Sequence, residues 1–461
     1  MGTMEEWKKI TLMTTVLAFL LEIRPLDPFL TAYLTGPDVN VPLDEVAEVL
    51  TPIRVYMGIV GTALCFLFAD YVLYKPVLIV DGLVGIVMYY NFIGSPSKLQ
   101  LWVSMALLSI YVCAELTCLS YVYVKIQDKL KYQTATGFIR SGTLCGTALS
   151  GLIGQVLVYF SGGRYTILPY ISLVGVSLAF VWAWFLPAVK YSSFLQNVLE
   201  QPIDPVSSKT ALDDGRTPKY VDSTIANQVK HNEPEQIPTR IKLFNRLLED
   251  LSLSLSDQTV LKWSFWNTLA LTGFMQVAVN INVLYTYNED TTGDYRTLLN
   301  GMVEFVKTLS GAFCTYKIGF VNVDWDLYGD YFLGCGSLVL GVLMGLCNFI
   351  HNNYYVYIMY ICYGVLFQSM VVIAQSQIAK NLKDDCYALV LGFSAFVAIC
   401  IGTVFTMFVV SMNVFNTTVA QQFLFYGALY EFLGVVYLWN NFSNGKTVFR
   451  GWCCAKSYED L

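Results

Sequence analysis

Charge and histidine are the two features that this sequence has in short supply. Only 13% of its 461 residues are charged, with 28 Lys and Arg against 34 Asp and Glu, whereas soluble globular proteins average about 25%. So few charges cannot cover a soluble surface of this size, and a net charge of −6 offers no basic face to nucleic acid. These shortages exclude a disordered chain, a nucleic-acid binder and most soluble enzymes.

Motifs for metals, cofactors and nucleotides are also missing. The chain has two histidines, His231 and His351, so we expect no histidine-based metal or acid–base site. Its twelve cysteines include no Cys-x-x-Cys pair, and most lie in apolar runs, where a free thiol behaves as a small hydrophobe. The sequence Gly445-Lys446-Thr447 lacks the upstream glycine of a phosphate-binding loop. We therefore expect no cofactor and no ATP-driven step.

Long apolar runs are what the sequence has in abundance. Hydrophobic residues make up 55% of the chain and aromatic residues 15%, with a mean hydropathy of +0.52. A helix needs about 20 apolar residues to cross a bilayer. The runs long enough to do so are 10–34, 50–72, 76–94, 99–124, 135–160, 165–187, 259–286, 297–320, 328–350, 354–379, 386–411 and 420–440. The pattern predicts an all-α membrane protein with twelve transmembrane helices.

One polar segment divides these runs six and six. We expect an N-terminal six-helix half over 1–190, a linker over 191–258, a C-terminal half over 259–442 and a tail over 443–461. The end of the linker, from Arg240 to Leu255, is amphipathic and is expected at the membrane interface. Two six-helix halves joined by a polar linker are typical of the major facilitator fold.

Lys and Arg gather on the side of the membrane that holds both chain ends. The positive-inside rule therefore predicts cytoplasmic termini and a cytoplasmic linker. The opposite loops are acidic, and one of them carries Asn416-Thr417-Thr418, a predicted glycosylation sequon.

Several ionisable residues fall at membrane depth, where each is costly and a candidate for function. The alternative for each is a structural ion pair or a long side chain that reaches the interface. Lys307 lies one turn from Glu304 and would neutralise it if the two pair. The set consists of Glu22, Arg24, Asp27, Arg54, Asp81, Glu115, Glu304 and Lys307.

The first span carries its charges around two prolines. Pro25 and Pro28 remove backbone donors in the middle of the run, so we expect a broken helix facing a cavity. We interpret Arg24 as the partner of Glu22 or of another acid, holding the break together, and Asp27 as a ligand-facing acid.

Glu115 lies among Tyr111, Tyr121 and Tyr123, a setting that suits a planar cation through charge and cation–π contact. A pair with a base from the other half is the alternative for Glu115.

Asp70, Lys75 and Arg140 are predicted at the cytoplasmic ends of their spans. We interpret them as gate residues, with an Asp–Arg latch that breaks between two states. Charges that only set topology are the alternative.

These motifs resemble those of the reduced folate carrier and thiamine transporter family over nearly all spans. The resemblance implies a major facilitator fold in the plasma membrane, and carriage of folates or thiamine coupled to protons or anion exchange, without ATP. The segments that carry it are 22–38, 70–77, 132–144, 170–173, 300–304 and 377–392.

The resemblance also bears on the substrate. Where folate-carrying members place bases, this chain has Glu115, Gly364 and Gly402, whereas its acids at Asp27, Glu115 and Glu304 are similar to those of thiamine transporters. It departs from those transporters in having Arg54 and Met105 in place of a Trp and a Glu, and Lys307 in place of a small residue.

We therefore expect alternating-access transport of thiamine or a related organic cation. The three acids would attract the cation, and the rings of Tyr56 and Tyr111 would stack on it. Glu115 would couple its transport to protons by taking up a proton when the cation leaves.

The runner-up is a folate-like anion held by Arg54 and Lys307. A membrane-embedded enzyme or receptor is another class, but the sequence has no zinc motif, no nucleophile elbow and no large soluble domain. A carrier-like sensor or binding surface that has lost transport is the third class, and the departures at Arg54 and Met105 keep it open.

Overall fold

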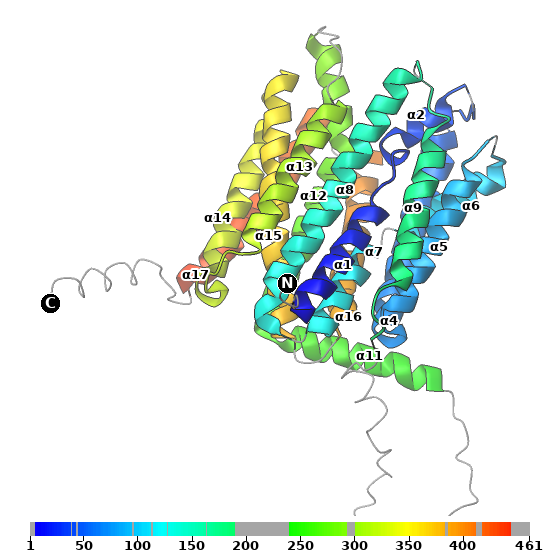
Figure 1. Ribbon diagram of the computed structural model, residues 1–461. Coiled ribbons are helices and arrows are strands. Elements are labelled where there is room, and N and C mark those ends of the chain that lie inside the picture. The colour runs from blue at the N-terminus through cyan, green and yellow to red at the C-terminus, as the bar shows by residue number, and fades with distance from the viewer. Residues whose placement is uncertain are drawn as a thin grey trace, which may run out of the picture.

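The computed structural model describes residues 5–37, 39–42, 45–94, 96–111, 114–126, 128–162, 164–189, 239–292, 300–382, 386–411 and 417–443. The helices stand side by side as a bundle, and one of them, α11, lies across one end (Figure 1). We call this end the α11 end.

The helices before the central segment are α1 (Glu6–Leu21), α2 (Leu30–Thr35), α4 (Thr51–Val72), α5 (Lys75–Asn91), α6 (Lys98–Tyr111), α7 (Ala114–Ile126), α8 (Tyr132–Phe160) and α9 (Leu168–Trp184). Those after it are α11 (Thr239–Ser256), α12 (Gln258–Thr292), α13 (Asn300–Ile318), α14 (Trp325–Leu346), α15 (Asn353–Asn381), α16 (Tyr387–Phe405) and α17 (Val419–Ser443).

Each of the twelve predicted apolar runs overlaps at least one of these helices, but the structure does not directly confirm the predicted count of spans. By length and composition, eight helices in the described part of the chain are able to cross a membrane. The runs that fall short do so for local reasons. The first is broken between α1 and α2, α5 and α9 have only 17 residues each, and α13 carries three charges, those of Glu304, Lys307 and Lys317.

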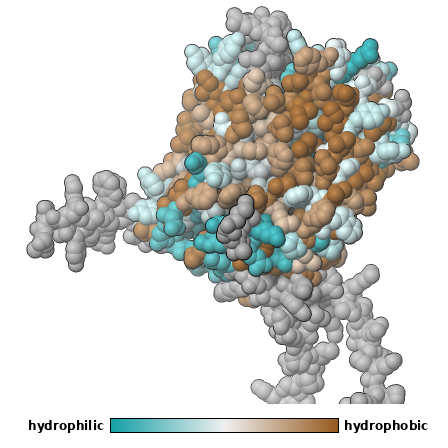
Figure 2. All heavy atoms as spheres, in the orientation of Figure 1, coloured by the Kyte–Doolittle hydropathy of each residue, from teal (hydrophilic) through white to brown (hydrophobic). Residues whose placement is uncertain are grey.

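The outer surface of the bundle is apolar over its flank. Hydrophobic side chains cover most of the visible flank in Figure 2, and hydrophilic ones gather toward the end that α11 crosses. Large apolar residues on several helices are well exposed, among them Val174, Val279 and Phe313. In water such a surface would aggregate, so the flank is the lipid-facing side of a multi-pass membrane protein.

The first helix is broken where the prolines predict. It ends at Leu21, and a single 3₁₀ turn at Asp27–Phe29 leads into α2. Two serines on neighbouring helices accept the amides freed by the break: Ser150 of α8 from Arg24, at 3.0 Å, and Ser172 of α9 from Leu26, at 3.1 Å. The break is therefore a fixed part of the interior.

Helix α8 packs along α1 on one side and along α13 on the other. Its glycines allow the approach. A Cβ added at Gly146 would lie 2.5 Å from the Phe19 carbonyl of α1, and one at Gly137 would lie 2.8 Å from the Thr315 carbonyl of α13. Close backbone contact of this kind is the known use of small residues in membrane helices.

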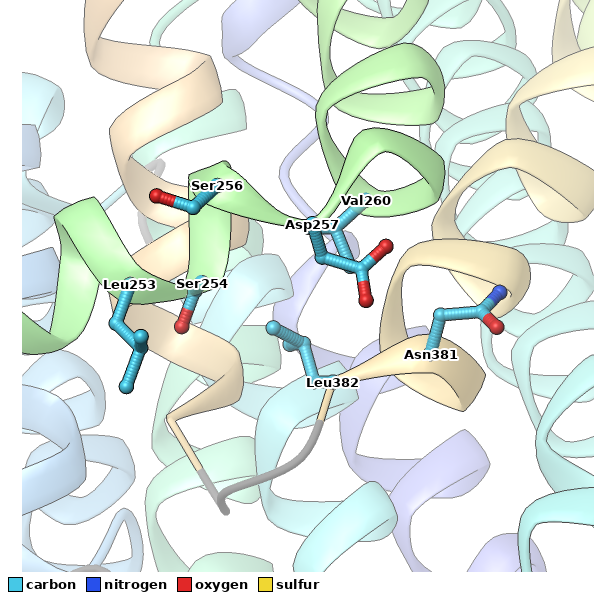
Figure 3. A pocket seen from close by; sticks show the side chains of 7 residues that line it. All are labelled: Leu253, Ser254, Ser256, Asp257, Val260, Asn381 and Leu382. Carbon is cyan, nitrogen blue, oxygen red and sulfur yellow. The ribbon is translucent and has the colours of Figure 1, made fainter.

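The amphipathic end of the predicted linker forms α11, which contacts α12 and α16. A small cavity of about 170 Å³ lies where α11 turns into α12 and meets the end of α15 (Figure 3). It is lined by Leu253, Ser254, Ser256, Asp257, Val260, Asn381 and Leu382. Residues 190–238 of the linker, Asn416 of the sequon and 444–461 of the tail lie outside the described residues.

The glycine contact gives a direct test. We expect Gly146→Ala to lower the free energy of unfolding by about 1–3 kcal/mol, because the new methyl group meets a backbone carbonyl that has no room to move. Thermal unfolding of the protein in detergent measures the effect. Gly151→Ala on the same helix is the matched control, since nothing lies within 4 Å of a Cβ there. Equal melting temperatures for the two variants would contradict the packing argument.

Candidate functional site

The break in the first helix holds a charge cluster. Nη2 of Arg24 lies 2.7 Å from Oε2 of Glu22, and its Nη1 lies 3.0 Å from Oδ2 of Asp27. Tyr89 donates to Oδ1 of Asp27 at 2.5 Å. The five-residue break between α1 and the 3₁₀ turn thus brings two acids onto one guanidinium, which a regular helix would not do.

Tyr111 packs its ring against the guanidinium of this cluster. Its ring centroid is 5.1 Å from the Arg24 guanidinium, and its hydroxyl donates to the Leu21 carbonyl at 2.9 Å. The side chain is buried. The structure therefore gives the Tyr111 ring a cation from its own chain, where the sequence predicts a cation from outside.

The second cluster joins helices from both sides of the central segment. Nη1 of Arg140 on α8 lies 3.2 Å from Oε1 of Glu115 on α7, a charge contact without hydrogen-bond alignment. The same guanidinium donates to Gln375 of α15 at 3.1 Å and to Gln368 at 3.4 Å. Arg140 lies eight residues after the first residue of α8, about 12 Å along the helix.

The third cluster lies on α13 and α15. Nζ of Lys307 is 2.6 Å from Oε1 of Glu304 and donates to its Oε2 at 2.8 Å. It also donates to the Tyr360 hydroxyl at 2.7 Å. All three clusters therefore bring acids and bases together within apolar runs of the sequence.

The bases and acids of these clusters differ in exposure. The side chains of Arg24, Arg140 and Lys307 are 12%, 12% and 8% exposed. Their acid partners Glu22, Asp27, Glu115 and Glu304 are 21%, 30%, 29% and 46% exposed. In the pair of Lys262 with Asp330 the order is reversed, at 20% and 4%. Burying the base and leaving the acid accessible is thus a property of these three clusters.

In the part of the chain that the structure describes, the remaining candidates make no ion pair or hydrogen bond with these clusters. Arg54 and Tyr56 are exposed near the start of α4. Asp81 of α5 is 3% exposed, and its Oδ2 has no hydrogen-bond partner among the described residues. A buried carboxyl oxygen of this kind is costly unless the group is neutral.

Asp70 reaches across to a helix from the other side of the central segment. Its carboxylate accepts the backbone amides of Ala388 and Leu389, at 3.1 and 2.7 Å, in the first turn of α16. It also accepts the Tyr74 hydroxyl. A carboxylate at this place complements the positive end of the helix dipole.

The turn that follows Asp70 is strained. Leu73 and Tyr74 both have positive φ, of 64° and 60°, which is costly for residues with a side chain. Lys75, just beyond it, donates to the Trp184 carbonyl at 2.9 Å. The structure thus places Asp70, Lys75 and Arg140 in three different contacts, where the sequence predicts a direct Asp–Arg latch.

Further contacts close the same end of the bundle. The hydroxyls of Tyr132 and Tyr387 lie 2.9 Å apart, within a buried group of rings that includes Tyr123. Gln133 of α8 donates to the carbonyls of Ile318 and Val321, each at 2.8 Å. These contacts link α7 and α8 to α16 and to the end of α13, so the α11 end is shut.

Sequence reasoning missed the uncharged members of the clusters. Gln368, Gln375 and Tyr360 each bind a buried base, and Phe274 lies against Lys307. Two glutamines within an apolar run of α15 were the available signal, because an amide at that depth needs a partner.

Comparison with solved structures identifies the architecture. The crystal structure of the human organic anion transporter MFSD10 aligns with a TM-score of 0.63, covering 94% of this chain and 100% of that one at 13% identity. That likeness, with the helical bundle and its apolar flank, defines a multi-pass membrane protein with the major facilitator fold.

The sequence places the chain within that class. The profile of the reduced folate carrier family matches residues 5–425, and the chain belongs to this family of membrane transporters. Human thiamine transporter 1 is 30% identical over 94% of this chain and 89% of its own length. Folate transporter 1 of Caenorhabditis elegans is 26% identical over 96% and 95%.

The contact of Asp70 with α16 predicts how the α11 end stays shut. We expect Asp70→Ala to raise the rate of maleimide labelling at Cys386 at least tenfold, because this buried thiol lies at the start of α16. Peptide mapping by mass spectrometry measures the rate.

Asp324→Ala is the matched control for Asp70→Ala. Asp324 caps α14 by accepting the Asp326 amide at 3.1 Å, within a single segment of the chain. Its loss is expected to cost about 1 kcal/mol of stability and to leave Cys386 protected. Labelling that is the same in both variants would mean that Asp70 does not hold the end closed.

Proposed function

We propose that this chain is a secondary-active carrier of thiamine or a related organic cation. The observation that carries the proposal is the exposure pattern of the three clusters. In each one the base is the more buried partner and the carboxylates are the more accessible. A ligand that enters the bundle therefore meets negative charge first, which favours a cation.

The names of the relatives bring a folate-like anion into consideration as the second candidate. Arg54 is exposed and favours it. Lys307 does not, because its ammonium already faces both oxygens of Glu304 and the Tyr360 hydroxyl, which occupy its donors. An anion approaching this cluster would meet the carboxylate before the ammonium.

The proposed mechanism is alternating access. The helices before and after the central segment rock about the clusters, and the contacts of Asp70 and Arg140 hold the α11 end shut in this state. Because Lys and Arg gather at this end, we place it in the cytoplasm together with both chain termini, in a plasma membrane. The open state at the opposite end then loads substrate.

Uptake by expressing cells tests the substrate. We expect labelled thiamine to accumulate above the level of untransfected cells, and labelled folate not to, at both pH 5.5 and pH 7.4. Folate uptake without thiamine uptake would reverse the assignment. Uptake of neither, with the protein at the cell surface, would favour a carrier-like sensor that has lost transport.

Glu115 is our candidate for proton coupling, because its carboxylate would take up a proton when the cationic substrate leaves. Arg140, 3.2 Å away, is the base that faces this carboxylate. Glutamine cannot take up a proton, so we expect Glu115→Gln to lower thiamine uptake about tenfold or more and to flatten its dependence on pH. Uptake is measured between pH 5.5 and 8. Glu45→Gln is the control, since Glu45 pairs with Lys98 at 3.0 Å outside the clusters. A pH profile that Glu115→Gln leaves unchanged would remove Glu115 from the coupling step.

A further inference from the structure

The ammonium group of Lys307 lies in a setting built to hold a cation. Beyond its contacts with Glu304 and the Tyr360 hydroxyl, Nζ lies 4.4 Å from the centroid of the Tyr360 ring. It lies 5.9 Å from the ring of Phe274 on α12. A carboxylate together with aromatic faces is the combination by which proteins bind organic ammonium groups.

The aromatic side of this setting is an extended stack. Phe274 stacks on Phe367 with centroids 4.2 Å apart and planes 3° from parallel. Tyr363 lies nearly parallel to both Phe274 and Tyr360, at 6.3 and 6.5 Å. Tyr363 is held in turn by a 2.7 Å hydrogen bond with Tyr430. The stack is fixed by packing and does not depend on Lys307 for its order.

The chain makes room for the lysine at one point. A Cβ added at Gly364 of α15 would lie 2.6 Å from Cγ and Cδ of Lys307, so the lysine stem lies directly against the α15 backbone. The lysine side chain is 8% exposed and that of Glu304 is 46% exposed. The ammonium thus approaches Glu304 from the buried side, and the other side of the Glu304 carboxylate stays accessible.

We propose that Glu304, Tyr360 and Phe274 form an ammonium-binding subsite that Lys307 occupies as a tethered cation, in competition with the cationic group of a substrate. The proposal rests on the proposed function for the sign of the substrate's charge. A tethered group competes at an effective concentration on the order of millimolar. One carboxylate cannot neutralise two cations in a site of low dielectric, so the substrate has to displace the lysine.

Binding of two cationic probes to purified protein tests the proposal. Lys307→Met keeps the length of the stem against Gly364 and removes the charge. We expect it to bind labelled thiamine and labelled tetramethylammonium at least tenfold more tightly than the unaltered protein. Lys307→Gln, which keeps a donor toward Tyr360, is expected to do the same and serves if the methionine variant does not fold.

Two controls separate the subsite from a general effect of charge. Lys317→Met removes a lysine of the same helix, exposed and 5.5 Å from the Phe313 ring, and is expected to leave both affinities unchanged. Adding Glu304→Gln to Lys307→Met is expected to abolish the gain, because the carboxylate is the charged member of the subsite.

The outcomes distinguish the two proposals. A Glu304-dependent gain for tetramethylammonium in a protein that never binds thiamine supports the subsite and overturns the proposed substrate. Thiamine affinity that neither lysine variant changes overturns the subsite and leaves the proposed function standing. Absence of tetramethylammonium binding to the folded variants also overturns the subsite. Loss of folate binding in Lys307→Met would make Lys307 an anion contact and overturn both.

Discussion

An ionised group in hydrocarbon has to be neutralised by a neighbour, and the interior of this bundle is arranged around that requirement. Arg24, Arg140 and Lys307 each lie against carboxylates that come from a chain break, an adjacent helix or the preceding turn. The break after Leu21 allows the carboxylates of Glu22 and Asp27 to reach the guanidinium of Arg24. Pairing the charges in this way allows the helices to pack around them. In each of the three clusters the acids remain the more accessible partners.

The fold could be predicted from the sequence because the features that define it are long apolar runs and short local motifs. Apolar runs located the helices, Pro25 and Pro28 located the break, and the polar end of the linker located α11. The span count was harder, because helices that bury charges or small residues inside a bundle are less apolar than lipid-facing ones. Helix α13 is such a case, with Glu304 and Lys307 in its first half.

The partners of the charged residues could be predicted only where they are near in sequence. Glu22 with Arg24, and Glu304 with Lys307, lie within one turn of each other. Arg140 instead meets Gln375, 235 positions away, and Asp70 meets amides more than 300 positions away. Such pairings depend on how α8 lies against α15 and how α4 lies against α16. Neither Asp70 nor Arg140 carries a local signal for its partner.

The contact of Asp70 has a consequence for how this protein can change over time. The groups it binds at positions 388 and 389 belong to the main chain, and every residue except proline supplies such an amide. Substitutions at those two positions therefore leave the bond intact. The acid at position 70 has to stay, whereas its partner residues at 388 and 389 are free to change. The contact between these two helices would therefore leave no pair of co-varying side chains in a set of related sequences.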